Sequence, residues 1–277
     1  MNKVLRSAIP VIMLMIAASC STKKNTVVTR SYHNLTSHYN IYFNGYDAFN
    51  TGVNKLESGF KDDYNSQLPL FPYSSKDAVR ISLSDMDKTV KKCSKVIGMH
   101  SIKAKPKAKK GGKSAREKEF YRKKEYVKWV DDAFLLMGKA YFYKRDFLPA
   151  IETLEYVITQ FPDGGLADEA SLWLAKARLE LKQYPESQQI LDRLQGDPKL
   201  DPKLKPQLQA VYANWYLQQN DLASSIPLLE QSAETYPSRY ERLRIGYVLG
   251  QLYEKDKDSA NAIRWYSWVN EMKPPYE

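Results

Sequence analysis

The stretch DDAFLLMGKAYFYKRDFLPAIETLEYVITQFP, residues 131–162, decides the fold of this 277-residue chain. Apolar and small residues recur in it three or four positions apart, first at Phe134, Met137, Gly138 and Tyr141, then at Ala150, Leu154 and Val157. Because residues at this spacing share one face of an α-helix, the stretch predicts two short antiparallel helices joined near Lys144. Gly138 and Ala150 are small enough to let the two backbones approach, and Pro162 ends the pair.

The small residue at this helix crossing returns three more times along the chain. Steps of 37 or 38 residues lead from Gly138 to Ala175, Ala213 and Gly250, and from Ala150 to Ser187, Ser225 and Ala262. This pattern resembles the tetratricopeptide repeat, whose period is roughly 34 residues. The resemblance predicts an all-α, tetratricopeptide-repeat-like helical solenoid of about four repeats over residues 115–277, preceded by divergent N-terminal helices.

Residues 32–98 predict an N-terminal helical region that diverges from the repeats. Asn44-Gly45 is expected to form a turn between two helices, and a third helix is expected from about Lys76 to Ile97. His33 and His38 are expected to be partly exposed, because no third ligand lies at a spacing useful for a metal. No metal site and no cofactor are predicted.

The first residues have the layout of a secretory signal. Lys3 and Arg6 precede an apolar run, and small residues come directly before Cys20. We interpret residues 1–19 as a signal peptide, Cys20 as a lipid attachment site, and residues 20–31 as a lipid-anchored tether. An ordinary signal peptide with an incidental cysteine is the alternative. Cys93 would then be the only remaining thiol, and we expect it to be a small core residue of its helix.

Residues 100–124 contain eleven lysines and arginines against Glu117 and Glu119. Residues 99–114 predict a disordered basic loop, with Lys103, Lys105, Lys107, Lys109, Lys110 and Lys113 as its candidate binding residues. A helix is expected from about Ala115 to Val130. The loop is either simply solvated or attracted to anionic lipid or an acidic protein surface. Nucleic acid is disfavoured, because residues 100–119 offer no aromatic platform for stacking bases.

Stacked helical pairs leave a concave surface lined by the first helix of each repeat. The positions that face this groove in the repeat family correspond to Lys139, Phe142, Tyr143, Lys176, Asn214, Gln218, Tyr247 and Gln251. This mixed polar and aromatic lining favours protein or peptide binding. The usual signatures of catalysis, including a serine elbow, a zinc-protease helix and a phosphate-binding loop, do not occur in the sequence, so no enzyme is predicted.

A more specific resemblance comes from three features together: the Cys20-Ser21-Thr22-Lys23-Lys24-Asn25-Thr26 start, the aromatic segment Tyr32–Gly45, and repeats that follow a basic insertion. Together they resemble the SprE/PorW lipoproteins of type IX secretion and gliding motility, whose members are considerably longer than 277 residues. The resemblance implies a scaffold on the periplasmic side of the outer membrane that links the secretion translocon to the periplasmic ring. Two other repeat lipoproteins remain as alternatives: a BamD-like assembly factor and a SusD-like glycan-capturing protein.

Overall fold

The structure is a computed structural model that describes residues 21–107, 114–162 and 165–272. The predicted signal peptide, Cys20, and three residues of the basic loop, Lys109, Lys110 and Lys113, lie outside these ranges. Every regular element among the described residues is helical. The predicted all-α, tetratricopeptide-repeat-like solenoid is therefore confirmed.

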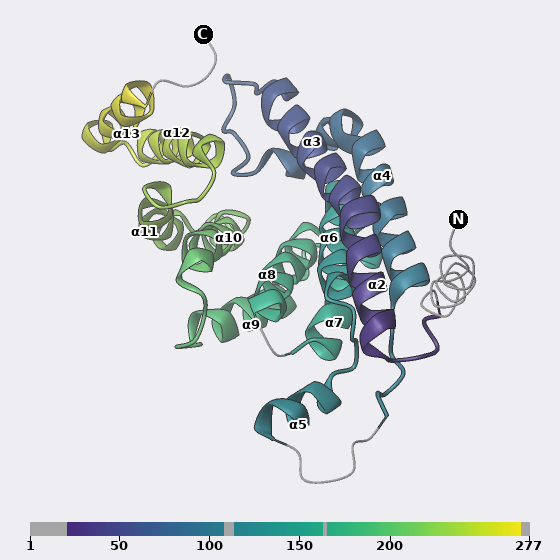
Figure 1. Cartoon of the computed structure of the whole chain (residues 1–277). Coiled ribbons are helices and arrows are strands. Elements are labelled where there is room, and N and C mark those ends of the chain that lie inside the picture. The colour runs from purple at the N-terminus through teal and green to yellow at the C-terminus, as the bar shows by residue number, and fades with distance from the viewer. Residues whose placement is uncertain (1–20, 108–113, 163–164, 273–277) are drawn as a thin grey trace, which may run out of the picture.

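The N-terminal part consists of α2 (Val27–Ser37), a π-helical turn (His38–Tyr42), α3 (Phe43–Gly59) and α4 (Lys76–His100), with a short 3-10 turn (Pro72–Ser74) before α4. A short helix, α5 (Ala115–Arg122), leads to the repeats. The first helices of the four pairs are α6 (Trp129–Tyr143), α8 (Gly165–Glu180), α10 (Lys205–Leu217) and α12 (Arg239–Lys255); the second helices are α7 (Phe147–Gln160), α9 (Tyr184–Gln195), α11 (Leu222–Ala233) and α13 (Ser259–Glu271). Figure 1 shows the pairs stacked in an arc, with α3 and α4 forming one end of it.

The turn inside each repeat has the same backbone geometry. A non-glycine residue adopts the left-handed conformation in every turn, namely Arg145 (φ 61°), Lys182 (φ 59°), Asn220 (φ 61°) and Lys257 (φ 63°). These positions follow one another in the 37- to 38-residue steps of the sequence pattern. A left-handed residue at this point ends the first helix and directs the chain into the second.

The small residues of the sequence pattern lie where the two helices of a repeat cross. A Cβ on Gly138 would lie 2.8 Å from Cδ2 of Leu154. Ala175 and Ala213 are completely buried. Gly250 meets the ring of Tyr266, whose Cδ1 would lie 2.6 Å from an added Cβ. The predicted close approach of the backbones is therefore confirmed.

The prediction of a turn at Asn44-Gly45 is wrong. The chain continues through these residues as a helix from Val27 to Gly59, interrupted only by the π-helical turn. Gly45 is instead a close-approach residue, because a Cβ there would lie 3.1 Å from Cβ of Lys92 on α4. The helix also begins inside the predicted tether of residues 20–31, where Thr26 caps its first turn by accepting a hydrogen bond from the Thr29 amide.

The basic region differs from the prediction in two ways. The described part of the predicted disordered loop is held in place, because Ile102 is completely buried and the Asn25 side chain donates to the Ala104 carbonyl at 2.6 Å. The helix expected from Ala115 to Val130 breaks after Arg122. It breaks because Glu125 turns inward and accepts hydrogen bonds from the amides of Ile102 (2.8 Å) and Val127 (3.0 Å).

A second apolar cluster lies between α4 and α6 and includes Cys93, Val96, Ile102 and Val130. Cys93 is completely buried, so the expectation of a core thiol is confirmed. Among the described helices, none is both long and apolar enough to cross a membrane.

Candidate functional site

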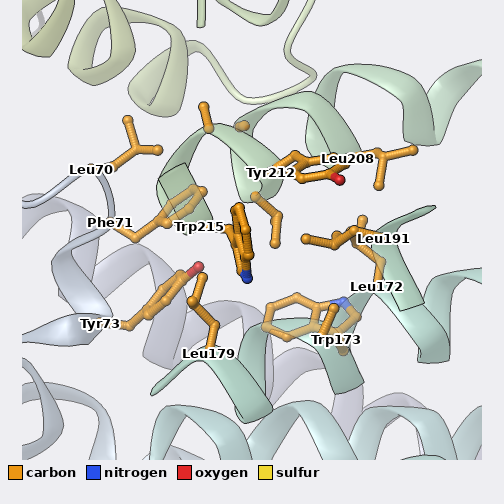
Figure 2. Packing of buried hydrophobic residues seen from close by; sticks show 14 of the residues in the cluster. Leu70, Phe71, Tyr73, Leu172, Trp173, Leu179, Leu191, Leu208, Tyr212 and Trp215 are labelled. Atoms are coloured by element: carbon orange, nitrogen blue, oxygen red, sulfur yellow. The ribbon is translucent and has the colours of Figure 1, made fainter. Parts of the chain in front are cut away.

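The concave surface of the solenoid is covered by the chain's own α3–α4 connection. We call residues 60–75 the clasp. Its buried side chains include Leu68, Leu70, Phe71 and Tyr73. They belong to the same apolar cluster as the first helices of the repeats. Figure 2 shows Phe71 and Tyr73 directed toward Trp215 of α10 and Leu179 of α8.

The first half of the clasp is bound by two side chains of α12. The Gln251 carboxamide accepts from the Leu68 amide at 2.9 Å and donates to the Ser66 carbonyl at 3.0 Å. The Arg244 guanidinium donates to the Pro69 carbonyl at 3.1 Å. Because these contacts are made to the main chain, the groove holds this segment through its backbone.

Arg244 also forms a buried ion pair with Asp62 of the clasp. Its two terminal nitrogens lie 2.7 and 2.8 Å from the two carboxylate oxygens of Asp62. Only 4% of the Arg244 side chain and 10% of the Asp62 side chain are exposed. Such a two-pronged, charge-assisted contact fixes both position and orientation.

The second half of the clasp is held by the first two repeats. The Arg145 guanidinium donates to the carbonyls of Tyr73 (3.2 Å) and Ser74 (2.9 Å) and lies 3.1 Å from a carboxylate oxygen of Glu180. The other oxygen of Glu180 accepts from the Ser74 hydroxyl at 2.6 Å. Arg145 is also the left-handed turn residue of the first repeat, so the repeat turn itself positions this contact.

A lysine lies buried beneath the clasp. The Lys176 ammonium lies 4.2 Å from the centre of the Trp173 ring and 5.3 Å from that of Phe71. Aromatic faces stabilise a cation at such distances. Burial lowers the pKa of Lys176 and raises that of Glu241, and the attraction between their charges opposes both shifts.

Five of the eight predicted groove residues contact or underlie the clasp: Phe142, Tyr143, Lys176, Tyr247 and Gln251. Lys139 pairs with Glu169, Gln218 accepts a hydrogen bond from Tyr184 at 3.5 Å, and Asn214 is half-buried on α10. The prediction missed Arg244 and Arg145. Arg244 lies three residues before Tyr247, so helical spacing alone places both side chains on one face of α12.

A second candidate surface is a row of exposed apolar residues along the N-terminal helices α2 and α3. Leu35, Tyr39, Phe43 and Tyr46 are 60%, 65%, 56% and 48% exposed, and they follow one another at steps of three or four residues. We call these four residues the aromatic row. Tyr39 and Phe43 thus point to solvent. The face that packs on α4 carries the buried Gly45, Gly52 and Leu56 instead.

The two histidines of this region have different environments. His33 is buried, contrary to the expectation, and its Nδ1 lies 2.9 Å from Nδ1 of His100 at the end of α4. His38 is half-buried and stacks on Trp129 with 3.9 Å between the ring centres. Burial lowers the pKa of His33 and of His100. Both histidines therefore contribute to packing.

A match to a protein-family model supports the repeat architecture. Residues 142–214 match the family described as tetratricopeptide repeat. No curated protein matches the chain. Among solved structures, the crystal structure of BtubC (BKLC) from P. vanneervenii is similar, with 12% sequence identity, a TM-score of 0.48, and coverage of 83% of this chain and 91% of BtubC. The chain thus carries a tetratricopeptide repeat within an all-α solenoid, a fold that typically serves protein–protein interaction rather than catalysis.

Proposed function

We propose that this protein is a non-catalytic interaction scaffold of the type IX secretion and gliding machinery. It would be anchored through Cys20 to the periplasmic side of the outer membrane and would link the translocon to the periplasmic ring. The observation that carries this proposal is the exposed aromatic row. It lies almost entirely in the Tyr32–Gly45 segment on which the resemblance to the SprE/PorW lipoproteins is based.

The clasp determines which surface remains open to a partner. Since residues 60–75 occupy the concave groove, a partner that used the groove would first have to displace an ion pair and a buried aromatic cluster. The aromatic row needs no such rearrangement. Large exposed aromatic side chains that follow one another on one face are characteristic of protein interaction sites.

Affinity purification from membranes of a gliding bacterium tests the proposal. The full chain is compared with a variant that carries Tyr39→Ser, Phe43→Ser and Tyr46→Ser. A control carries Leu148→Ser and Ile263→Ser at two apolar residues of α7 and α13 that are 66% and 64% exposed. Because all five side chains are exposed, we expect both variants to fold normally.

The proposal predicts that translocon and ring proteins co-purify with the full chain and with the control, and are lost from the aromatic-row variant. Co-purification of barrel-assembly proteins alone would identify a BamD-like factor instead. Co-purification of a glycan transporter alone would identify a SusD-like protein. Equal recovery of translocon and ring proteins with both variants would place the partner surface outside the aromatic row.

A further inference from the structure

Three segments that are distant in sequence form one strongly basic surface. Residues 21–30, 101–107 and 114–128 contain twelve lysines and arginines against three glutamates. We call this surface the basic end. In Figure 1 the start of α2, the chain after α4, and α5 lie together at the end of the molecule away from α12 and α13. Most of the chain's net charge of +10 is concentrated there.

Specific contacts hold the basic end together. The Arg30 guanidinium lies 4.9 Å from the centre of the Phe120 ring, which joins α2 to α5. The Asn34 side chain of α2 accepts from the Lys128 amide at 2.8 Å. The Tyr121 hydroxyl donates to the Lys107 carbonyl at 2.8 Å, which joins α5 to the chain after α4. The charges are therefore displayed on a folded surface.

The three glutamates of the basic end are too few to balance its twelve lysines and arginines. Glu125 is buried and satisfies main-chain amides, and Glu117 closes the capping box of α5 with Ser114. Several ammonium groups donate to neutral oxygens: Lys105 to the carbonyls of Tyr121 (3.0 Å) and Lys123 (2.9 Å), and Lys124 to that of Thr159 (3.1 Å). These contacts position the cations without cancelling their charge.

The basic end also has a hollow and an apolar edge. The hollow, between α2, α5 and the segment before α6, measures about 790 Å³, and its charged lining consists of Arg30, Arg122, Lys123, Lys124 and Lys128 against Glu119, Glu125 and Asp131. Val27 and Val28, in the first turn of α2, are 69% and 61% exposed. Clustered lysines and arginines beside exposed apolar residues are the composition of surfaces that lie on anionic bilayers.

We propose that the basic end docks on the surface of an anionic lipid bilayer. The lysines and arginines would face phosphate headgroups, and Val27 and Val28 would enter the interfacial layer. The position of the surface in the chain supports this occupant, because its first residue, Ser21, directly follows the predicted lipid attachment site, Cys20. Docking would then fix the orientation of the solenoid, which a lipid anchor alone would leave free.

Vesicle co-sedimentation tests the proposal with residues 21–277, which include every residue that the structure describes. The protein is mixed with vesicles of phosphatidylcholine, with or without about one third phosphatidylglycerol, at about 0.05 M and about 0.5 M salt. The test variant carries Arg122→Gln, Lys123→Gln and Lys128→Gln. The control carries Lys199→Gln, Lys203→Gln and Lys205→Gln, three exposed lysines around the α9–α10 connection, and so loses the same charge.

The proposal predicts binding to the anionic vesicles at low salt and release at high salt. It also predicts that the test variant binds about tenfold or more weakly, whereas the control stays within about twofold of the parent chain. Equal weakening of both variants would mean that net charge alone acts, and would overturn the proposal. Polyglutamate, added in a parallel binding measurement, represents an acidic protein surface. Binding to polyglutamate without binding to vesicles would also overturn the proposal, in favour of an acidic protein partner. Neither acylation nor a secretion partner enters this experiment, so its outcome is independent of the proposed function.

Discussion

Removing the Asp62 carboxylate should strongly destabilise the protein, because the Arg244 guanidinium would remain buried without its counter-charge. The two side chains are joined by contacts of 2.7 and 2.8 Å and are 10% and 4% exposed. Breaking such a buried pair from one side costs about 3–5 kcal/mol. With about 2–3 °C per kcal/mol for a chain of this size, Asp62→Ala should lower Tm by about 10 °C.

A double-mutant cycle separates the pair from the rest of the clasp. In the variant with Asp62→Leu and Arg244→Met, apolar groups replace both charges, so most of the lost stability should return. About 1 kcal/mol should remain missing, because Arg244 no longer donates to the Pro69 carbonyl. Thermal unfolding followed by far-UV circular dichroism compares the parent chain, Asp62→Ala, the single variants Asp62→Leu and Arg244→Met, and the double variant. A loss below about 1 kcal/mol for Asp62→Ala would refute the reasoning, since a solvated pair behaves in this way.

Three further predictions concern other parts of the structure. Gly250→Ala should destabilise the fourth repeat by about 1–3 kcal/mol in urea unfolding, because its Cβ would meet the Tyr266 ring. Lowering the pH from about 7 to about 5 should reduce the stability contributed by His33 and His100. Burial lowers the pKa of both side chains in the folded chain, so below about pH 6.5 the unfolded chain binds more protons than the folded chain and is favoured. The Cys93 thiol, whose pKa burial raises to about 12, should resist alkylation until the protein unfolds.

Each of these predictions has its own control. Gly98→Ala, on an open face of α4 where an added Cβ meets nothing within 4 Å, should stabilise the chain by about 0.5–1 kcal/mol, and equal effects at both glycines would contradict the packing argument. For the histidines the comparison is with His33→Gln, which should show a smaller loss on acidification. Subtracting one loss of stability from the other isolates the histidine contribution. Buried carboxyls such as Glu241, whose pKa is raised by burial, gain stability on acidification, and they do so equally in both proteins. Rapid alkylation of native Cys93 would contradict its burial.

The repeats could be predicted because their signal is local. A small residue is required wherever the two helices of a repeat cross. This requirement recurs with the period of the fold, at Gly138, Ala175, Ala213 and Gly250. The helical conformation at Asn44-Gly45 could not be predicted, since glycine serves both turns and close helix contacts. Only the partner helix, α4, decides between the two at Gly45. The same limit applies to Glu125, whose inward hydrogen bonds break the helix that local propensity favours.

The clasp was also beyond local reasoning, although one signal was present. Leu68, Leu70, Phe71 and Tyr73 form a run that is unusually apolar for a connection, which indicates burial without showing where. Its position depends on α12, some 180 residues later, through Arg244 and Gln251. Five of the eight groove candidates contact or underlie the clasp, but no local pattern indicated that the chain itself occupies the groove.

Hydrogen exchange of residues 61–75 tests most directly that the groove is filled by the clasp. The structure predicts slow exchange for the Leu68 amide, which donates to Gln251, and for the buried amides around it, with faster exchange after Asp62→Ala. Exchange throughout this segment at the rate of an unstructured peptide would contradict the account. The concave groove would then be open, and it would become the first candidate for the partner surface.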